Sequence, residues 1–167
     1  MIFLDTNIWF ELLAVRTPIQ SNEINQARVA SSLLKELQQK DDQIITCKEQ
    51  LFELIKLIEK VKLKEVNKQR KDNNQKGFEK PKDFRKSIEF SDTQKLCISI
   101  IKDIKHFAVI KNFNTYDIDS ILKNLHLVDI NDYVYYNYCV NNHVDFYTFD
   151  NDFKNLNQHD KVHILTA

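Results

Sequence analysis

Four acidic residues lie far apart in the sequence, and each either follows a predicted strand directly or lies in a helix that adjoins one. Asp5 directly follows the apolar run "MIFL", and Asp150 directly follows "FYTF". Glu53 lies in the helix expected after the strand "IITC", and Asp132 begins the helix that leads into the strand before Asp150. Ligands of open α/β sheets bind at the carboxyl ends of the strands, and right-handed crossovers keep those ends on one edge. We therefore expect the four carboxylates to converge.

Carboxylates packed together repel one another, so a cluster of this kind usually needs a cation. Side-chain oxygen ligands suit Mg²⁺ or Mn²⁺ better than softer metals. The pattern therefore predicts a site for one of these two ions.

Each acid also has a local interpretation that stays open. Asp5, with Thr6 and Asn7 after it, could simply cap the next helix, because all three residue types are good N-caps. Asp132 could cap its own helix, and Asp150 could cap a turn around "DNDF".

Glu49 is the alternative to Glu53 as the second acid. The segment "TCKE" at positions 46–49 has the spacing of a capping box, in which Thr46 caps the helix and Glu49 reaches back to it. This local role for Glu49 favours Glu53 as the metal ligand.

The hydrophobic pattern alternates between strand and helix along the whole chain of 167 residues, a length that suits one domain. This alternation predicts an α/β fold with a mainly parallel sheet. The strands are expected at 1–4, at "IITC" after a turn within 41–47, and at 106–110, 144–149 and 162–165. The helices are expected at 7–15, 22–40, 48–61, 92–105, 115–125 and 132–142.

Composition excludes several classes of function. The chain has a single glycine, Gly77, so it can build neither a P-loop nor a Rossmann fingerprint, which need several glycines around a phosphate. Three widely spaced cysteines, with no CxxC pair, predict reduced thiols rather than a disulfide framework or zinc site. With no secretory signal and no apolar run long enough to span a bilayer, we expect a soluble, cytoplasmic protein without membrane contact.

The net charge of zero hides an uneven distribution. Residues 60–86 hold eleven Lys/Arg against four Asp/Glu, so the remainder carries thirteen against twenty. The segment at about 60–90 also holds the only glycine and one of the two prolines, which predicts a basic insertion or long loop with some helix.

At these residues the chain resembles the PIN-domain ribonucleases, particularly the VapC-like toxins. "FLDTN" resembles the family's first motif, with Asp5, and "LFEL" its second, with Glu53. Asp132 stands sixteen residues before Thr148, as the third acid does in the family, and "TFDNDF" at 148–153 resembles the closing motif. The third-acid helix is usually rich in alanine, whereas this one reads "DYVYYNYC". Asp129 therefore stays open as the substitute for Asp132.

The resemblance implies a three-layer α/β/α PIN-like fold and metal-dependent hydrolysis of RNA. One or two Mg²⁺ or Mn²⁺ would be held by Asp5, Glu53, Asp132 and Asp150, with Thr6, Asn7 and Thr148 as auxiliary polar residues. It also implies a homodimer and, in a toxin–antitoxin or phage-defence system, a protein antitoxin as partner. Because basic side chains neutralise phosphates, the basic segment is the expected RNA-binding element, through Lys68, Arg70, Lys71 and Lys76.

Two other readings of the same residues stay open. A PIN-like module could bind RNA or a protein without cutting it. A phosphatase of the haloacid dehalogenase type also starts from an aspartate after the first strand, but it needs a second aspartate two residues on, where this chain has Asn7.

Overall fold

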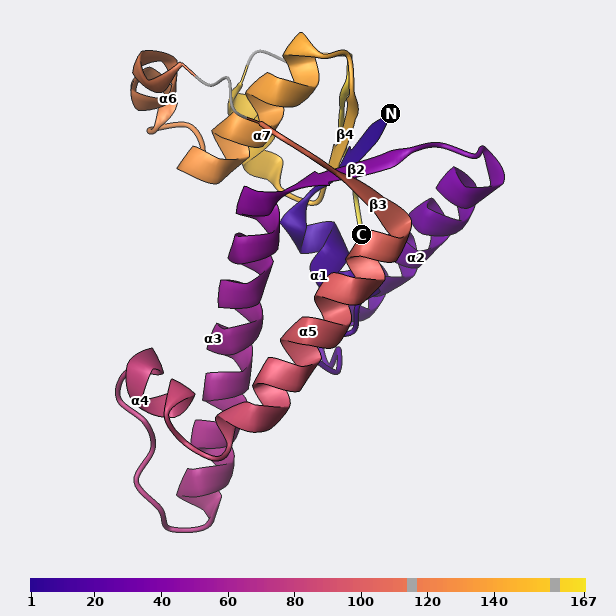
Figure 1. Ribbon diagram of the computed structural model, residues 1–167. Helices are drawn as coiled ribbons and strands as arrows, with labels where there is room; N and C mark the ends of the chain where they lie inside the picture. Colours follow the sequence, from indigo (N-terminus) through magenta and orange to yellow (C-terminus); the bar gives the residue numbers. More distant parts are fainter. Residues whose placement is uncertain (114–116, 157–159) are drawn as a thin grey trace. The chain divides into compact units, whose positions relative to one another are not determined.

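The computed structural model describes residues 1–113, 117–156 and 160–167. They form two compact units. The first comprises Met1–Gln50 and Phe107–Ala167, and the second comprises Leu51–His106. Figure 1 follows the chain through both units.

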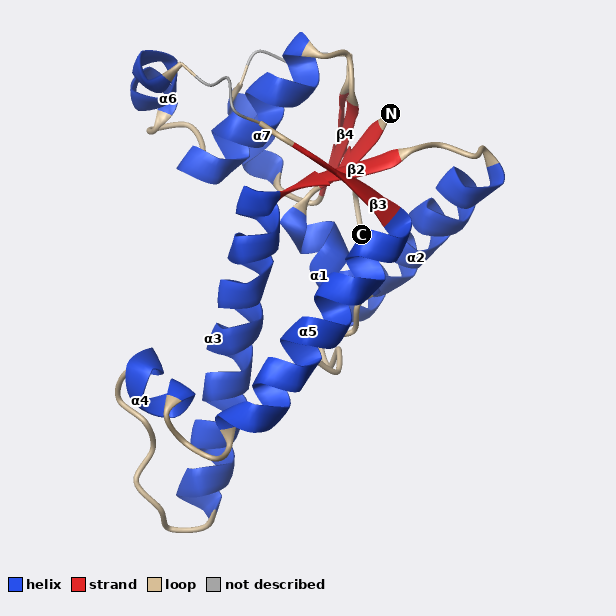
Figure 2. Cartoon of the chain, viewed as in Figure 1, coloured by secondary structure: helices blue, strands red, loops and turns tan. Residues whose placement is uncertain are grey.

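The first unit is built on a five-stranded sheet with the order β3-β2-β1-β4-β5 (Figure 2). Every neighbouring pair of strands is parallel, which confirms the predicted α/β class with a parallel sheet. β1 lies in the middle, and its Phe3 is in register with Ile45 on one side and Phe146 on the other. The strands are β1 (Ile2–Leu4), β2 (Ile44–Cys47), β3 (Ala108–Lys111), β4 (Asp145–Thr148) and β5 (Val162–Ile164).

Helices cover both faces of this sheet, as a three-layer fold requires. On one face Phe3 and Phe146 pack in a cluster with Tyr135 of α7. Ile2 and Leu4 alternate with Phe3 and are equally buried, so they point to the opposite face, on the side of α1 and α2 (Figure 1). The helices of this unit are α1 (Thr6–Leu12), α2 (Ser21–Gln39), α6 (Ile118–Asn124), α7 (Ile130–Asn141) and the 3₁₀ helix η1 (Asn151–Asn155).

The predicted elements are present, with shifts at their ends. α7 begins at Ile130, two residues before the predicted start at Asp132. The first residues of the helix predicted at 115–125 lie outside the described residues, and α6 begins at Ile118. All three cysteines are free thiols, as predicted. None of the described helices combines the length and the apolarity needed to cross a membrane.

The second unit contains most of α3 (Lys48–Asp72) together with α4 (Pro81–Arg85) and α5 (Phe90–Phe107). The helix predicted at 48–61 is longer than predicted, because α3 continues as far as Asp72, into the segment predicted as an insertion or long loop with some helix. Lysine, arginine, glutamine and glutamate dominate this stretch, and all four are strong helix formers. Half-buried apolar residues also continue along it, at Val61, Leu63 and Val66.

The turn after α3 is fixed by side chains of α3 itself. Asn67 donates its Nδ2 to the carbonyl of Phe78 at 3.0 Å and accepts the N–H of Phe78 at 2.7 Å. A Cβ on Gly77 would lie only 2.9 Å from Asn67 Oδ1. A side chain at Gly77 would therefore displace the Asn67 side chain that holds the turn.

Candidate functional site

The carboxylate of Asp5 is buried at the carboxyl end of β1, where only 3% of the residue is exposed. One oxygen accepts the backbone N–H of Thr6 at 2.6 Å, so Asp5 is the N-cap of α1. The other accepts the Asn7 amide at 2.8 Å and the Thr148 hydroxyl at 2.6 Å. These donors stabilise the charged carboxylate in its buried position. The capping interpretation is thus confirmed, but it accounts for only one of the two oxygens.

Thr148 connects the ends of β1 and β4. Its hydroxyl donates to Asp5 and accepts the backbone N–H of Asp150 at 2.9 Å. Asn7 strengthens the connection, because its Oδ1 accepts the backbone N–H of Phe149 at 3.3 Å. The structure therefore brings together four of the predicted site residues: Asp5, Asn7, Thr148 and Asp150.

Asp150 caps η1, as its local interpretation predicts, with Oδ1 accepting the N–H of Asp152 at 2.8 Å. Asp150 also lines a hollow of about 250 Å³ together with Asp129, Asp132 and Asp152. The hollow is completed by the 125–128 segment. Four carboxylates around one hollow create a negative potential that attracts cations.

The position of Asp132 on its helix differs from the prediction. Asp129, and not Asp132, occupies the N-cap position of α7, and Asp132 lies in the first turn. A carboxylate in the first turn is favoured by the helix dipole. Asp132 is half-buried and Asp129 is exposed. Both line the hollow, so the choice of Asp132 over Asp129 stays a prediction.

The capping box predicted at 46–49 is wrong. Thr46 lies within β2, α3 begins at Lys48, and the Thr46 hydroxyl donates to the side chain of Gln50 at 2.7 Å. Glu49 instead contacts Cys47. Burial raises the pKa of the Cys47 thiol to about 12, which keeps the thiol neutral.

Glu53 lies on α3 in the second unit, where it is half-buried. The local argument that favoured Glu53 over Glu49 no longer applies, since no capping box forms. Glu53 as the second acid stays a prediction based on the resemblance.

Gln50 was not among the predicted site residues, yet its side chain is buried beside the candidate site. It is 1% exposed, and its Nε2 donates to the carbonyl of Leu4 at 2.8 Å, directly before Asp5. Through Thr46 and the Leu4 carbonyl it connects the end of β2 to the end of β1 within the first unit. A polar residue within the apolar stripe of the predicted helix was the available signal.

The donor set suits a hard cation, since every candidate ligand is a carboxylate or hydroxyl oxygen. Within residues 1–113, 117–156 and 160–167, no three His, Cys, Asp or Glu side chains form a group that could hold a metal ion. Mg²⁺ in proteins commonly takes one or two carboxylates and keeps several waters. The hollow shared by Asp132 and Asp150 fits that mode. The buried Thr6 hydroxyl has no hydrogen-bond partner in the described structure, and such groups usually bind water.

The four basic residues predicted to bind RNA differ in their surroundings. Lys68 and Lys71 are exposed on α3. Arg70 instead donates to the carbonyl of Lys76 at 2.7 Å, pairs with Glu89, and lies 4.5 Å from the centre of the Phe78 ring. Lys76 pairs with Glu79 at 2.8 Å. Arg70 therefore holds the turn after α3, a role that competes with RNA binding.

Comparison of the chain with protein-family models, with curated proteins and with solved structures finds no match.

Proposed function

We propose that the chain is a metal-dependent endoribonuclease that hydrolyses phosphodiester bonds of RNA. The observation that carries the proposal is the hydrogen-bonded connection from Asp5 through Thr148 to Asp150. Asp5 and Asp150, two of the four acids that resemble the PIN-domain motifs, thus lie at the ends of neighbouring strands. Ligands of open α/β sheets bind at this edge.

In this proposal the carboxylates divide into two roles. Asp132 and Asp150 line the hollow and would hold Mg²⁺ or Mn²⁺ there. Asp5 is buried and would act as the fixed centre that orients Thr148 and Asn7. A divalent ion bound here would supply an activated water and would stabilise charge on the phosphate. The Thr6 hydroxyl would hold a water.

We further propose that the protein works in the cytoplasm, where its three free thiols would stay reduced. Its partners would be RNA and, if the chain is the toxin of a toxin–antitoxin pair, a protein antitoxin. A homodimer is part of the same proposal.

The test is cleavage of end-labelled RNA of mixed sequence by the purified chain, with Mg²⁺, with Mn²⁺ and with EDTA. We expect cleavage only with a divalent ion, and its loss in Asp150→Asn. The matched control is Asp117→Asn, because Asp117 caps α6 through the same bond to the N–H two residues on, at 3.1 Å. Asparagine is also a good N-cap, so both variants keep the cap and lose one charge.

Two outcomes would overturn the proposal. The first is a folded wild-type chain that cuts no RNA with either ion. The second is an Asp150→Asn variant as active as Asp117→Asn. RNA binding without cleavage would favour the module that binds without cutting.

A further inference from the structure

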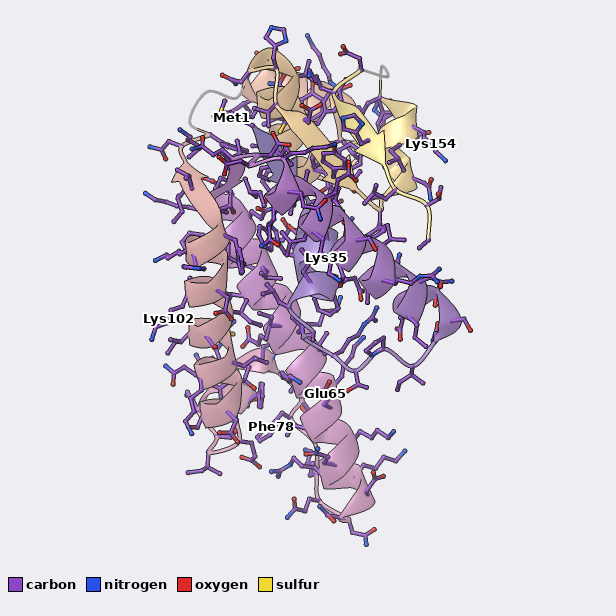
Figure 3. The ribbon with its side chains drawn as sticks, turned by 90° about the vertical axis from the view of Figure 1, so that its right-hand side faces the viewer. Met1, Lys35, Glu65, Phe78, Lys102 and Lys154 are labelled. Carbon is purple, nitrogen blue, oxygen red and sulfur yellow. The ribbon has the colours of Figure 1, made fainter. Side chains whose placement is uncertain are left out.

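One side of α3 carries a row of exposed lysines: Lys56, Lys60, Lys64, Lys68 and Lys71. At 100° per residue these positions fall within about a third of the helix circumference, and they extend over about 22 Å of its axis. The buried Leu54 and Ile58 lie on the other side of the helix. Figure 3 shows side chains projecting from α3, with Glu65 labelled.

Glu53 and Asp72 stand near the two ends of the row on α3, but no ion pair is found between a lysine of the row and another described residue of the second unit. The ion pairs of this unit are Lys62–Glu65, Arg70–Glu89, Lys76–Glu79, Arg85–Glu59 and Lys95–Asp92. None of these pairs involves a lysine of the row. Lys56, Lys60, Lys64 and Lys68 follow one another at four-residue spacing, which brings like charges together and destabilises a helix. Binding of an anion along the row would relieve this repulsion.

The row contains lysines and no arginine, which favours binding of the phosphate backbone of a nucleic acid over reading of its bases. Arginine is the residue that reads guanine by paired hydrogen bonds, and both arginines of the basic segment are engaged internally. Arg70 holds the turn and Glu89, and Arg85 makes two hydrogen bonds to the buried Glu59. The lysines left exposed are point charges suited to phosphates.

A membrane surface is a poorer match for the row. Helices that lie on membranes combine basic residues with exposed Trp, Phe or Leu. Phe52, four residues before Lys56 on α3, is exposed, but between Lys56 and Lys71 no large apolar side chain is exposed among the described residues. The row is also a single line of charge, which matches one strand of nucleic acid.

We propose that the lysine row of α3 binds the sugar-phosphate backbone of single-stranded RNA without reading its sequence. The inference rests on the proposed function for the identity of the ligand. In this proposal Arg70 and Lys76 are no longer RNA contacts. The RNA-binding surface instead extends along α3 from Lys71 to Lys56.

The experiment measures binding of fluorescent oligo(U) and oligo(A) of equal length to the full chain, in EDTA, over a series of salt concentrations. The variant is K60Q/K64Q/K68Q. Each lost phosphate contact removes about 0.7 from the slope of log affinity against log salt, so the slope should fall by about 2. Affinity for the two oligonucleotides should fall by the same factor.

The matched control is K35Q/K102Q/K105Q, which removes three exposed helical lysines outside the row; Lys35 and Lys102 are labelled in Figure 3. It should bind RNA with nearly the wild-type slope. Both variants should keep wild-type helical circular dichroism, because the substituted side chains are exposed.

The inference is overturned if the row variant keeps the wild-type slope, if the control loses as much, or if phosphatidylserine vesicles bind the row while RNA does not. Because EDTA prevents metal-dependent cleavage, the result is independent of nuclease activity. If the wild-type chain cleaves RNA but the row variant binds RNA normally, only this inference is overturned. If the row variant binds RNA more weakly but the wild-type chain cleaves no RNA, only the proposed nuclease activity is overturned.

Discussion

The Thr148 hydroxyl donates a 2.6 Å hydrogen bond to the carboxylate of Asp5, across 143 residues of sequence. Thr148 is fully buried and Asp5 is 3% exposed. They stand at the ends of β4 and β1, which are neighbours in the sheet. The connection between Asp5 and Thr148 therefore depends on the pairing of β1 with β4.

Removing the Thr148 hydroxyl should damage both stability and cleavage. Thr148→Val keeps the shape of the side chain but leaves the N–H of Asp150 without this acceptor and Asp5 without this donor. We expect a loss of about 1–3 kcal/mol in the free energy of unfolding, measured by urea denaturation, and loss of metal-dependent cleavage. Thr148→Ser keeps the hydroxyl and should retain activity. A valine variant as active as wild type would contradict the role of the bridge.

Asp132 and Asp129 can be distinguished by separate substitutions to asparagine. We expect Asp132→Asn to abolish cleavage, because Asp132 is the half-buried member of the pair. Asp129→Asn should leave cleavage near wild type and keep the N-cap of α7. The measurement is the rate of RNA cleavage over a Mg²⁺ titration, which also detects weakened metal binding. If activity disappears only in Asp129→Asn, the third acid is Asp129.

Gln50→Leu should destabilise the chain, whatever the chain does. The substitution removes the donor to the Leu4 carbonyl and the acceptor of the Thr46 hydroxyl, both in a buried position. Unsatisfied buried groups cost about 1–3 kcal/mol, so the midpoint of urea unfolding should fall. Gln38→Leu on α2 is the control, since Gln38 is exposed. Equal midpoints for the two variants would show that the buried network contributes nothing.

The edge of the sheet at β5 should respond to acid. Burial raises the pKa of Asp145, but hydrogen bonds from His163 and Lys161 outweigh it, so this pKa lies below its ordinary value. A lowered folded-state pKa stabilises the protein above the unfolded value of about 3.9, and that contribution disappears as the pH falls through the folded-state pKa. Asp145 is about one-third exposed, so we expect roughly 0.5 kcal/mol.

The measurement for Asp145 is urea unfolding of wild type and Asp145→Asn from neutral pH to below pH 4. The wild type should be the more stable at neutral pH, and the difference should vanish in acid. A difference that stays constant across this range would mean that the charge of Asp145 does not contribute.

The sequence alone determined the order and type of the elements. Apolar alternation and helical periodicity are local properties, and they located all five strands and the parallel class of the sheet. They also placed Asp5 and Asp150 at strand ends, because each follows its strand directly. The end of the helix predicted at 48–61 was placed too early, since the helix propensity of the basic segment continues α3 as far as Asp72.

Only the tertiary structure decided which polar groups satisfy one another. Residues 46–49 have the spacing of a capping box, but Thr46 lies within β2. The Thr46 hydroxyl donates its hydrogen bond to Gln50 instead. Arg70 was predicted to contact RNA. In the folded turn it instead binds the Lys76 carbonyl and the Glu89 carboxylate and lies over the ring of Phe78. A buried polar group must find a partner wherever the packed chain presents one. Such partners lie far away in sequence, where spacing carries no information about them.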